Sequence, residues 1–167
     1  FRFTAFTAAM LAAKRASDNI IDNVTVRPMQ VGKPFTVGPF TVEPINVAHS
    51  IPESCALLIS TPAGRVVHTG DWKLDPNPVG AAPTDIKRFG EIGADTSSPL
   101  ALICDSTNAL KDGTSPSEDE VAATLAALIA EAPHRVVLTT FASNVGRVIS
   151  IARAAEKAGR QVVLSGR

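Results

Sequence analysis

Two residues that can bind a divalent metal stand where β-like runs give way to loops. His49 follows the run 40–47, and Asp71 follows the run 65–69. An imidazole nitrogen and a carboxylate oxygen are ligands that a catalytic zinc or manganese site uses when it keeps one position open for water. A carboxylate has two oxygens, so Asp71 can also bridge two metals that share a hydroxide. The pair predicts a metal-dependent hydrolase.

Each of the two residues also has a simpler explanation. A histidine at the end of a strand is often a hydrogen-bonded structural residue, and His49 fits that description. Asp71 lies in Thr69-Gly70-Asp71-Trp72, where a turn aspartate commonly caps nearby amides. It is the pairing of the two residue types that favours a metal site.

A second acidic residue, Asp105, ends the apolar run 100–104 and begins Asp105-Ser106-Thr107-Asn108. An Asx turn at the end of a strand explains an aspartate in this place as well as a chemical role does. The sequence leaves both explanations open.

Ser143, Asn144 and Val145 lie where a predicted strand meets a predicted helix. The start of a helix offers free backbone N–H groups and the positive end of a dipole, which together suit a phosphate. The alternative is that Ser143 or Asn144 serves only as the helix cap. Arg147, one turn into the helix, adds a positive charge.

The first half of the chain predicts one helix and several short strands. The alanine-rich segment 4–16 is a helix with Met10 and Leu11 on its inner face. Thr61-Pro62-Ala63-Gly64 is a hairpin turn between two strands. Short β-branched runs separated by Gly and Pro predict strands at 24–29, 35–37, 40–47, 57–61 and 65–69.

The second half predicts a change to strand–helix alternation. Residues 76–99 are rich in Pro, Gly and Ser and predict a loop with at most one short helix near 86–89, and the run 100–104 predicts a strand buried on both faces. Ser115 caps a following helix, with Pro and Glu in the positions that favour a helix start. The inner face of that helix is predicted at Val121, Leu125, Leu128 and Ile129.

Beyond it, a strand at 135–141, a helix at 144–158 and a strand at 161–164 form a crossover. Two strands joined through a helix in this way are expected to be parallel.

Composition limits the class of protein. Apolar residues make up 45% and charged residues 19%, so the chain can bury a core, and the formal net charge of zero gives no overall basic field. Cys55 and Cys104 share no metal-binding spacing and are expected to be buried thiols. The chain contains no run of 18 apolar residues, so no membrane span is predicted. Both ends of the chain look cut from something longer, because it opens without a methionine and stops just after a strand-like run.

Five collinear segments, taken together, resemble ribonuclease J, a member of the β-CASP branch of the metallo-β-lactamase superfamily. Each segment alone is weak, but the set covers nearly the whole chain. The segments are Ala48-His49-Ser50-Ile51-Pro52-Glu53, Thr69-Gly70-Asp71-Trp72-Lys73-Leu74-Asp75, Cys104-Asp105-Ser106-Thr107-Asn108-Ala109, Pro116-Ser117-Glu118, and Phe141-Ala142-Ser143-Asn144-Val145 with Arg147.

The resemblance implies an α/β fold, with 1–115 as part of a metallo-β-lactamase-type αββα sandwich and 116–167 as the start of a β-CASP domain. It implies that His49 is a zinc ligand and that Asp71 is the catalytic carboxylate bridging two zincs. Asp105 would be a catalytic acidic residue that orients a His later in the full chain. The family's His-x-His-x-Asp-His cluster does not occur here and is expected upstream of Phe1.

By the same resemblance, Ser143, Asn144 and Val145 would contact RNA. The implied activity is zinc-dependent hydrolysis of RNA phosphodiester bonds, 5′-to-3′ exonucleolytic with some endonucleolytic cutting, in RNA processing and decay. Two Zn²⁺ are expected, with Mn²⁺ or Mg²⁺ as alternatives. The resemblance also implies RNA with a 5′-monophosphate as substrate, a bacterial cytoplasmic location, no membrane partner, and dimers or tetramers.

Two rival hypotheses remain. One is a different metallo-β-lactamase-fold hydrolase of small esters or thioesters, although the Asp105 segment and the alternation after it argue against that. The other is an RNA-binding paralogue that has lost its metals.

Overall fold

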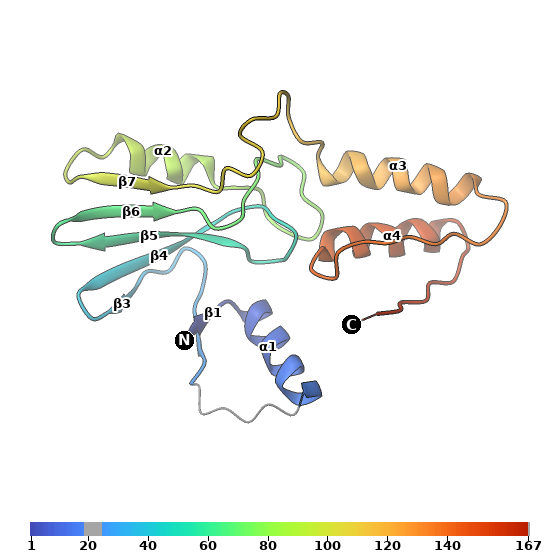
Figure 1. Ribbon diagram of the computed structural model, residues 1–167, viewed down its shortest axis with the longest axis horizontal. Coiled ribbons are helices and arrows are strands. Elements are labelled where there is room, and N and C mark those ends of the chain that lie inside the picture. The colour runs from blue at the N-terminus through green and yellow to red at the C-terminus, as the bar shows by residue number, and fades with distance from the viewer. Residues whose placement is uncertain (19–24, 167) are drawn as a thin grey trace.

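The computed structural model describes residues 1–18 and 25–166, and these form a mixed α/β structure (Figure 1). Five strands make one sheet in the order β3-β4-β5-β6-β7. The α/β class predicted from the sequence is confirmed. The strands are β3 (Phe35–Val37), β4 (Phe40–Asn46), β5 (Cys55–Thr61), β6 (Gly64–His68) and β7 (Leu100–Ile103), and the helices are α1 (Ala5–Asp18), α2 (Ile86–Ala94), α3 (Glu118–Glu131) and α4 (Val145–Lys157).

The strands β3 to β6 follow one another as an antiparallel meander, and β7 joins β6 in parallel. A parallel neighbour requires a crossover connection, which α2 supplies. The predicted hairpin turn between β5 and β6 is present. Gly64 has a φ of 150°, and a Cβ there would lie 3.0 Å from the carbonyl oxygen of Pro99, so a side chain would not fit.

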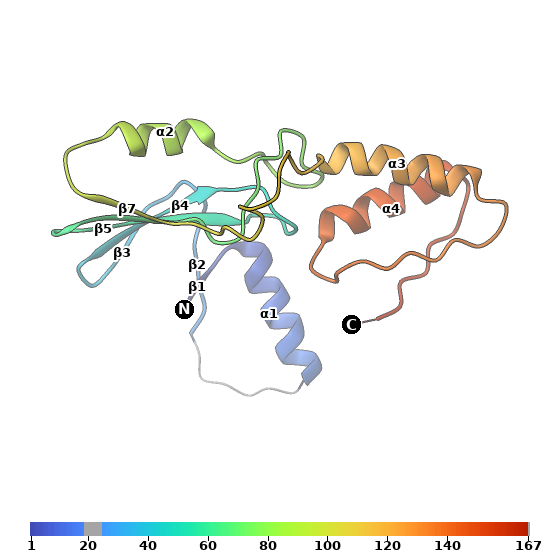
Figure 2. The ribbon, with the colours of Figure 1, turned by 45° about the horizontal axis from the view of Figure 1, so that its top comes forward.

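The hydrophobic core lies between the sheet and α2, which covers one face (Figure 2). Alternate residues of β4, β5 and β6 point to this face because side chains of a strand alternate in direction. Burying each aliphatic side chain contributes about 1.5–3 kcal/mol. The buried cluster consists of Ile45, Val47, Ala56, Leu58, Val67 and Ile92, with Trp72 and Phe89 packed against it.

The helix α2 is longer than the sequence predicted. It runs to Ala94, whereas the expected helix ended near Phe89. Gly90 and Gly93 lower the intrinsic helix propensity of this segment. Tertiary packing overrides that penalty, since Ile92 is buried against the sheet and the carboxylate of Asp85 accepts a hydrogen bond from the Arg88 amide at the start of the helix.

The helix α1 is present, but its predicted inner face is wrong. None of its residues is buried, and Met10 is 55% exposed. Figure 2 shows the reason, because α1 projects away from the sheet on the face opposite α2. The strand expected at 24–29 appears as β2 (Arg27–Pro28), which pairs in parallel with β1 (Arg2–Phe3). Val24 lies outside the described residues.

The strand β7 is present, but the prediction that it is buried on both faces is wrong. Leu102 is 64% exposed and Ile103 is 54% exposed. β7 is the edge strand of the described sheet, and none of its residues belongs to the buried cluster between the sheet and α2. Cys104, expected to be buried, is also exposed, and Cys55 is half-buried.

The helices α3 and α4 pack on each other to one side of the sheet (Figure 1). The N-cap of α3 is Ser117 rather than the predicted Ser115. Of the predicted inner face, Ile129 is buried but Leu128 is 60% exposed. The buried residues of α4 are small, which lets its backbone approach its neighbours closely, and they are Gly146, Ser150, Ala154 and Ala155.

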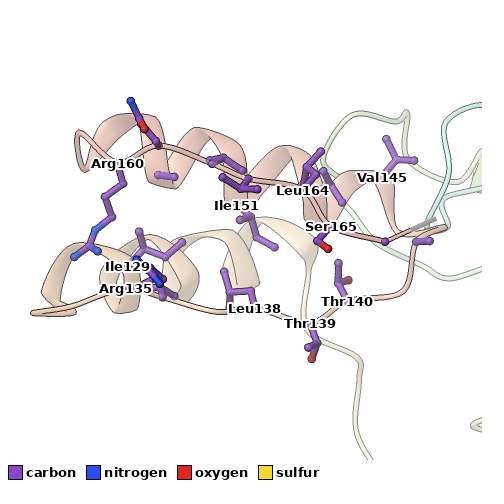
Figure 3. Close-up of a pocket in the computed structure, with 18 residues that line it drawn as sticks. Ile129, Arg135, Leu138, Thr139, Thr140, Val145, Ile151, Arg160, Leu164 and Ser165 are labelled. Atoms are coloured by element: carbon purple, nitrogen blue, oxygen red, sulfur yellow. The ribbon is translucent and has the colours of Figure 1, made fainter.

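Residues 135–141 and 161–164 were predicted as strands, but in the described part of the chain they form no strand ladder. The apolar, β-branched pattern is there, yet a strand also needs a partner for its backbone groups. Here the two segments do not pair with each other. They line a hollow of about 950 Å³ together with α4, as Figure 3 shows.

No helix among the described residues is long and apolar enough to cross a membrane.

Candidate metal and phosphate site

One hollow of about 380 Å³ brings together residues that are far apart in the sequence. Its lining includes His49, Asp71 and Ser143. His49 follows the end of β4, Asp71 follows β6, and Ser143 precedes α4. The structure therefore places both predicted metal ligands and one predicted phosphate-binding residue around the same space.

Backbone contacts hold the His49 and Asp71 loops side by side. The amide of Lys73 donates to the carbonyl oxygen of Ala48 at 3.0 Å, which closes an isolated antiparallel bridge. The buried hydroxyl of Thr84 accepts from the Ala48 amide at 2.9 Å and donates to the Lys73 carbonyl at 2.7 Å. Because both strand ends are fixed to Thr84, the adjoining metal-ligand candidates are held at the same edge of the sheet.

The orientation of His49 is set by its neighbour. The ring is half-buried, and its Nδ1 lies 3.1 Å from the hydroxyl oxygen of Ser50. This hydrogen bond occupies one ring nitrogen, as metal-binding histidines commonly require. His68 accepts the Gly70 amide on Nδ1 at 3.0 Å. Gly70 has a φ of 60°, so His68 stabilises the turn that leads into Asp71.

Asp105 lies next to this site and is held as an Asx turn. Its amide donates to the Thr69 hydroxyl at 3.0 Å, and its Oδ1 accepts from the Thr107 hydroxyl at 2.5 Å and the Thr107 amide at 3.0 Å. These bonds to Thr107, with the charge of nearby His49, hold the pKa of the Asp105 carboxyl below its usual range. Asp105 is therefore a carboxylate at neutral pH, suited to accept or orient a proton rather than to donate one.

Trp72 packs beside this arrangement and supports it. Its Nε1 donates to the carbonyl oxygen of Asp105 at 3.4 Å, and its ring packs against Phe89 at 6.2 Å between centroids.

The start of α4 is anchored on the His49 loop. The amide of Val145 donates to the carbonyl oxygen of Ser50 at 2.9 Å. Asn144 caps the helix, since its Oδ1 accepts the Arg147 amide at 3.0 Å. Two of the amides expected to bind phosphate are thus engaged within the protein. Ser143 is exposed and lines the hollow.

The sequence did not reveal a group of charged residues behind the site. The sequence placed Glu118 only at a helix start and Arg147 only as a positive charge near another helix start, yet the two form an ion pair at 3.1 Å. Asp75 accepts hydrogen bonds from the Ser117 hydroxyl at 2.7 Å and the Glu118 amide at 3.0 Å. The motif segments that contain these residues were recognisable, but pairing between distant segments leaves no signal in a single sequence.

Glu53 was also missed. It has a φ of 59°, which is strained for a residue with a side chain. Glu53 lines the hollow, and its carboxylate accepts the Phe6 amide at 2.8 Å, which fixes the first turn of α1 beside the site.

The donor set fits part of a zinc site. His49 and Asp71 offer the imidazole nitrogen and carboxylate oxygens that zinc prefers. Within 1–18 and 25–166, no group of three or more His, Cys, Asp or Glu side chains is placed to hold a metal ion. In this hollow, His49 and Asp71 are the two candidate ligands.

Comparisons with known proteins agree with the motifs. A sequence family described as the ribonuclease J β-CASP domain matches residues 133–167, the region around the larger hollow. Proteins named Ribonuclease J are similar along most of the chain. The one from Sinorhizobium meliloti is 53% identical over 96% of this chain, the one from Thermus thermophilus is 44% identical over 83%, and the one from Mycobacterium tuberculosis is 43% identical over 97%.

A solved structure shares the fold. It is the crystal structure of a protein of unknown function from Enterococcus faecalis V583, with a TM-score of 0.66, 19% identity, and coverage of 91% of this chain and 38% of that chain. The chain spans about a quarter of the length of the relatives, covering 28%, 23% and 28% of the three proteins above. Along most of its residues, the chain is therefore similar to a part of proteins named Ribonuclease J.

Proposed function

We propose that the protein hydrolyses RNA phosphodiester bonds with the help of bound metal. The observation that carries this proposal is the hollow lined by His49, Asp71 and Ser143, in a chain 53% identical to a protein named Ribonuclease J. His49 and Asp71 would hold the metal, which suits two Zn²⁺ with Mn²⁺ or Mg²⁺ as alternatives. When bound, the metal supplies an activated hydroxide and neutralises developing charge.

The chain's own residues have separate tasks in this proposal. Ser143 binds a phosphate oxygen of the substrate at the edge of the hollow, and the positive end of the α4 dipole supports that contact. Asn144 and Val145 hold this loop in the position in which it contacts RNA. Asp105 stays ionised and orients a histidine supplied from elsewhere in the full-length protein. That histidine protonates the leaving 3′-oxygen.

The finer features of the proposal follow the family resemblance. They are 5′-to-3′ exonuclease activity with some endonuclease activity, a role in RNA processing and decay, preference for a 5′-monophosphate, assembly as dimers or tetramers, and a cytoplasmic location. The proposal also includes a domain boundary between residues 115 and 116. The placement of α3 and α4 to one side of the sheet supports that boundary (Figure 1).

The test is an assay of the full-length protein on 5′-monophosphorylated RNA, with and without chelator. We expect chelator to abolish cleavage and Asp71→Ala to do the same. Cleavage that persists in chelator would overturn the metal mechanism. RNA binding without cleavage would indicate a metal-free RNA-binding protein, and cleavage of esters or thioesters without RNA cleavage would indicate a small-molecule hydrolase.

A further inference from the structure

A cluster of charged side chains joins the loop that carries Asp71 to the helices α3 and α4. Lys73 Nζ lies 2.8 Å from Asp75 Oδ2 and 3.3 Å from Glu118 Oε1. On the other side of Glu118, Arg147 donates from Nε to Oε2 at 3.2 Å and from Nη2 to Oε1 at 3.1 Å. We call Lys73, Asp75, Glu118 and Arg147 the charge cluster.

The charge cluster is shielded from solvent. The side chains of Asp75 and Glu118 are only 1% and 14% exposed, and those of Lys73 and Arg147 are 25% and 29% exposed. Shielded ion pairs are screened little by salt, and removing one partner leaves the other charge uncompensated. The cluster is therefore a fixed joint between the sheet and the helices.

The charge cluster is connected to the hollow through the first turn of α4. Arg147 lies in the first turn of α4, and its amide is capped by Asn144, the residue after Ser143. The same turn packs closely on the loop after Asp75, since a Cβ on Gly146 would lie 2.8 Å from the carbonyl oxygen of Val79. The position of Ser143 beside the hollow thus depends on how this turn is docked.

We propose that Glu118, acting through Arg147, is a positioning residue that holds the Ser143 loop in place for the phosphate of the substrate. This inference rests on the proposed function. Arg147 could otherwise contact RNA directly. The geometry favours positioning, because Glu118 engages Arg147 at two of its nitrogens on the protein side.

The test compares Glu118→Gln with a matched control in the full-length protein. Glu131→Gln is the control, since Glu131 is an exposed glutamate at the other end of α3. Both variants are assayed for KM and kcat on 5′-monophosphorylated RNA. Binding of a cleavage-resistant phosphorothioate RNA is measured by fluorescence anisotropy. Urea denaturation checks that each variant is folded, and Arg147→Lys replaces Glu118→Gln if that variant is not.

We expect Glu118→Gln to raise KM and Kd about tenfold, equivalent to about 1.4 kcal/mol. The value of kcat should change by less than about threefold, because the reacting groups are not touched. Glu131→Gln should match the wild type. An unchanged KM and Kd, or a loss confined to kcat, would overturn the inference.

The salt dependence of binding by Arg147→Gln separates the two roles of Arg147. A lost direct phosphate contact lowers the slope of log K against log salt by about 0.7 for single-stranded RNA. Positioning predicts weaker binding with an unchanged slope, and a lowered slope would overturn it. If the wild type neither binds nor cleaves RNA, the proposed function fails. If the wild type cleaves RNA and Glu118→Gln behaves like it, only the positioning role fails.

Discussion

Asp75→Asn is expected to destabilise the fold strongly, because the Asp75 carboxylate ties the loop after Asp71 to the start of α3. The residue is 3% exposed. Its two oxygens receive the Ser117 hydroxyl at 2.7 Å, the Asn77 amide at 3.0 Å, the Glu118 amide at 3.0 Å and Lys73 Nζ at 2.8 Å. An asparagine keeps one acceptor oxygen and places an N–H group where the other stood.

The magnitude follows from the two contacts that lose their acceptor. A hydrogen bond to a charged group is worth about 1.5–3 kcal/mol, so the two contacts at Oδ2 amount to about 3–6 kcal/mol. Breaking a buried ion pair by removing one partner costs about 3–5 kcal/mol, which agrees. We expect the free energy of unfolding to fall by about 3 kcal/mol or more.

Urea denaturation of the full-length protein, followed by circular dichroism, measures this change. Asp119→Asn is the matched control, because Asp119 is an exposed aspartate in the same first turn of α3. An exposed acidic residue in the first turn gains about 0.3–1 kcal/mol from the helix dipole, so the loss of its charge should cost less than about 1 kcal/mol. A similar small effect for both variants would refute the idea that Asp75 holds the joint.

Four further predictions test other parts of the structure. Burial alone raises the pKa of the Asp75 carboxyl, but the bonds from Lys73, Glu118, Ser117 and Asn77 outweigh it and hold that pKa well below its usual range. Asp75 thus stabilises the fold above its unfolded pKa of about 3.9, and the stability difference between wild type and Asp75→Asn should shrink as the pH falls below that value in acid titrations; a constant difference would contradict this. Gly146→Ala should lower the melting temperature because of the contact with Val79, whereas Gly93→Ala, which meets open space in α2, should raise stability by about 0.5–1 kcal/mol; equal shifts would argue against close docking of α4. Asn144→Leu should weaken RNA binding, and Asn144→Ser, which retains a capping oxygen, should largely restore it; unchanged RNA affinity in Asn144→Leu would remove this residue from the site. Glu53→Gln should leave α1 in place because its amide oxygen still accepts from Phe6, whereas Glu53→Leu should release the first turn of α1 and increase its hydrogen exchange; equal protection in the two variants would count against this contact.

Local patterns predicted much of the fold. The meander β3 to β6, the Gly64 turn, and the helices α1, α3 and α4 follow from signals carried by neighbouring residues. The same kind of signal indicated His49 and Asp71 as strand-end metal ligands, and the structure places both around one hollow.

Long-range features were not predictable in the same way. Residues 135–141 and 161–164 carry a strand pattern, but a ladder depends on a neighbour that the pattern does not specify. The exposure of β7 depends on its place at the edge of the sheet. The ion pair between Glu118 and Arg147 joins two helices, and nothing in the sequence indicated that these two side chains are paired.

The most direct test of the central claim is a crystal structure of the full-length protein grown with zinc, with anomalous scattering recorded at the zinc edge. We expect a zinc peak within about 2.2 Å of both a His49 ring nitrogen and an Asp71 carboxylate oxygen. Zinc bound elsewhere, with these two side chains directed away from it, would contradict the account.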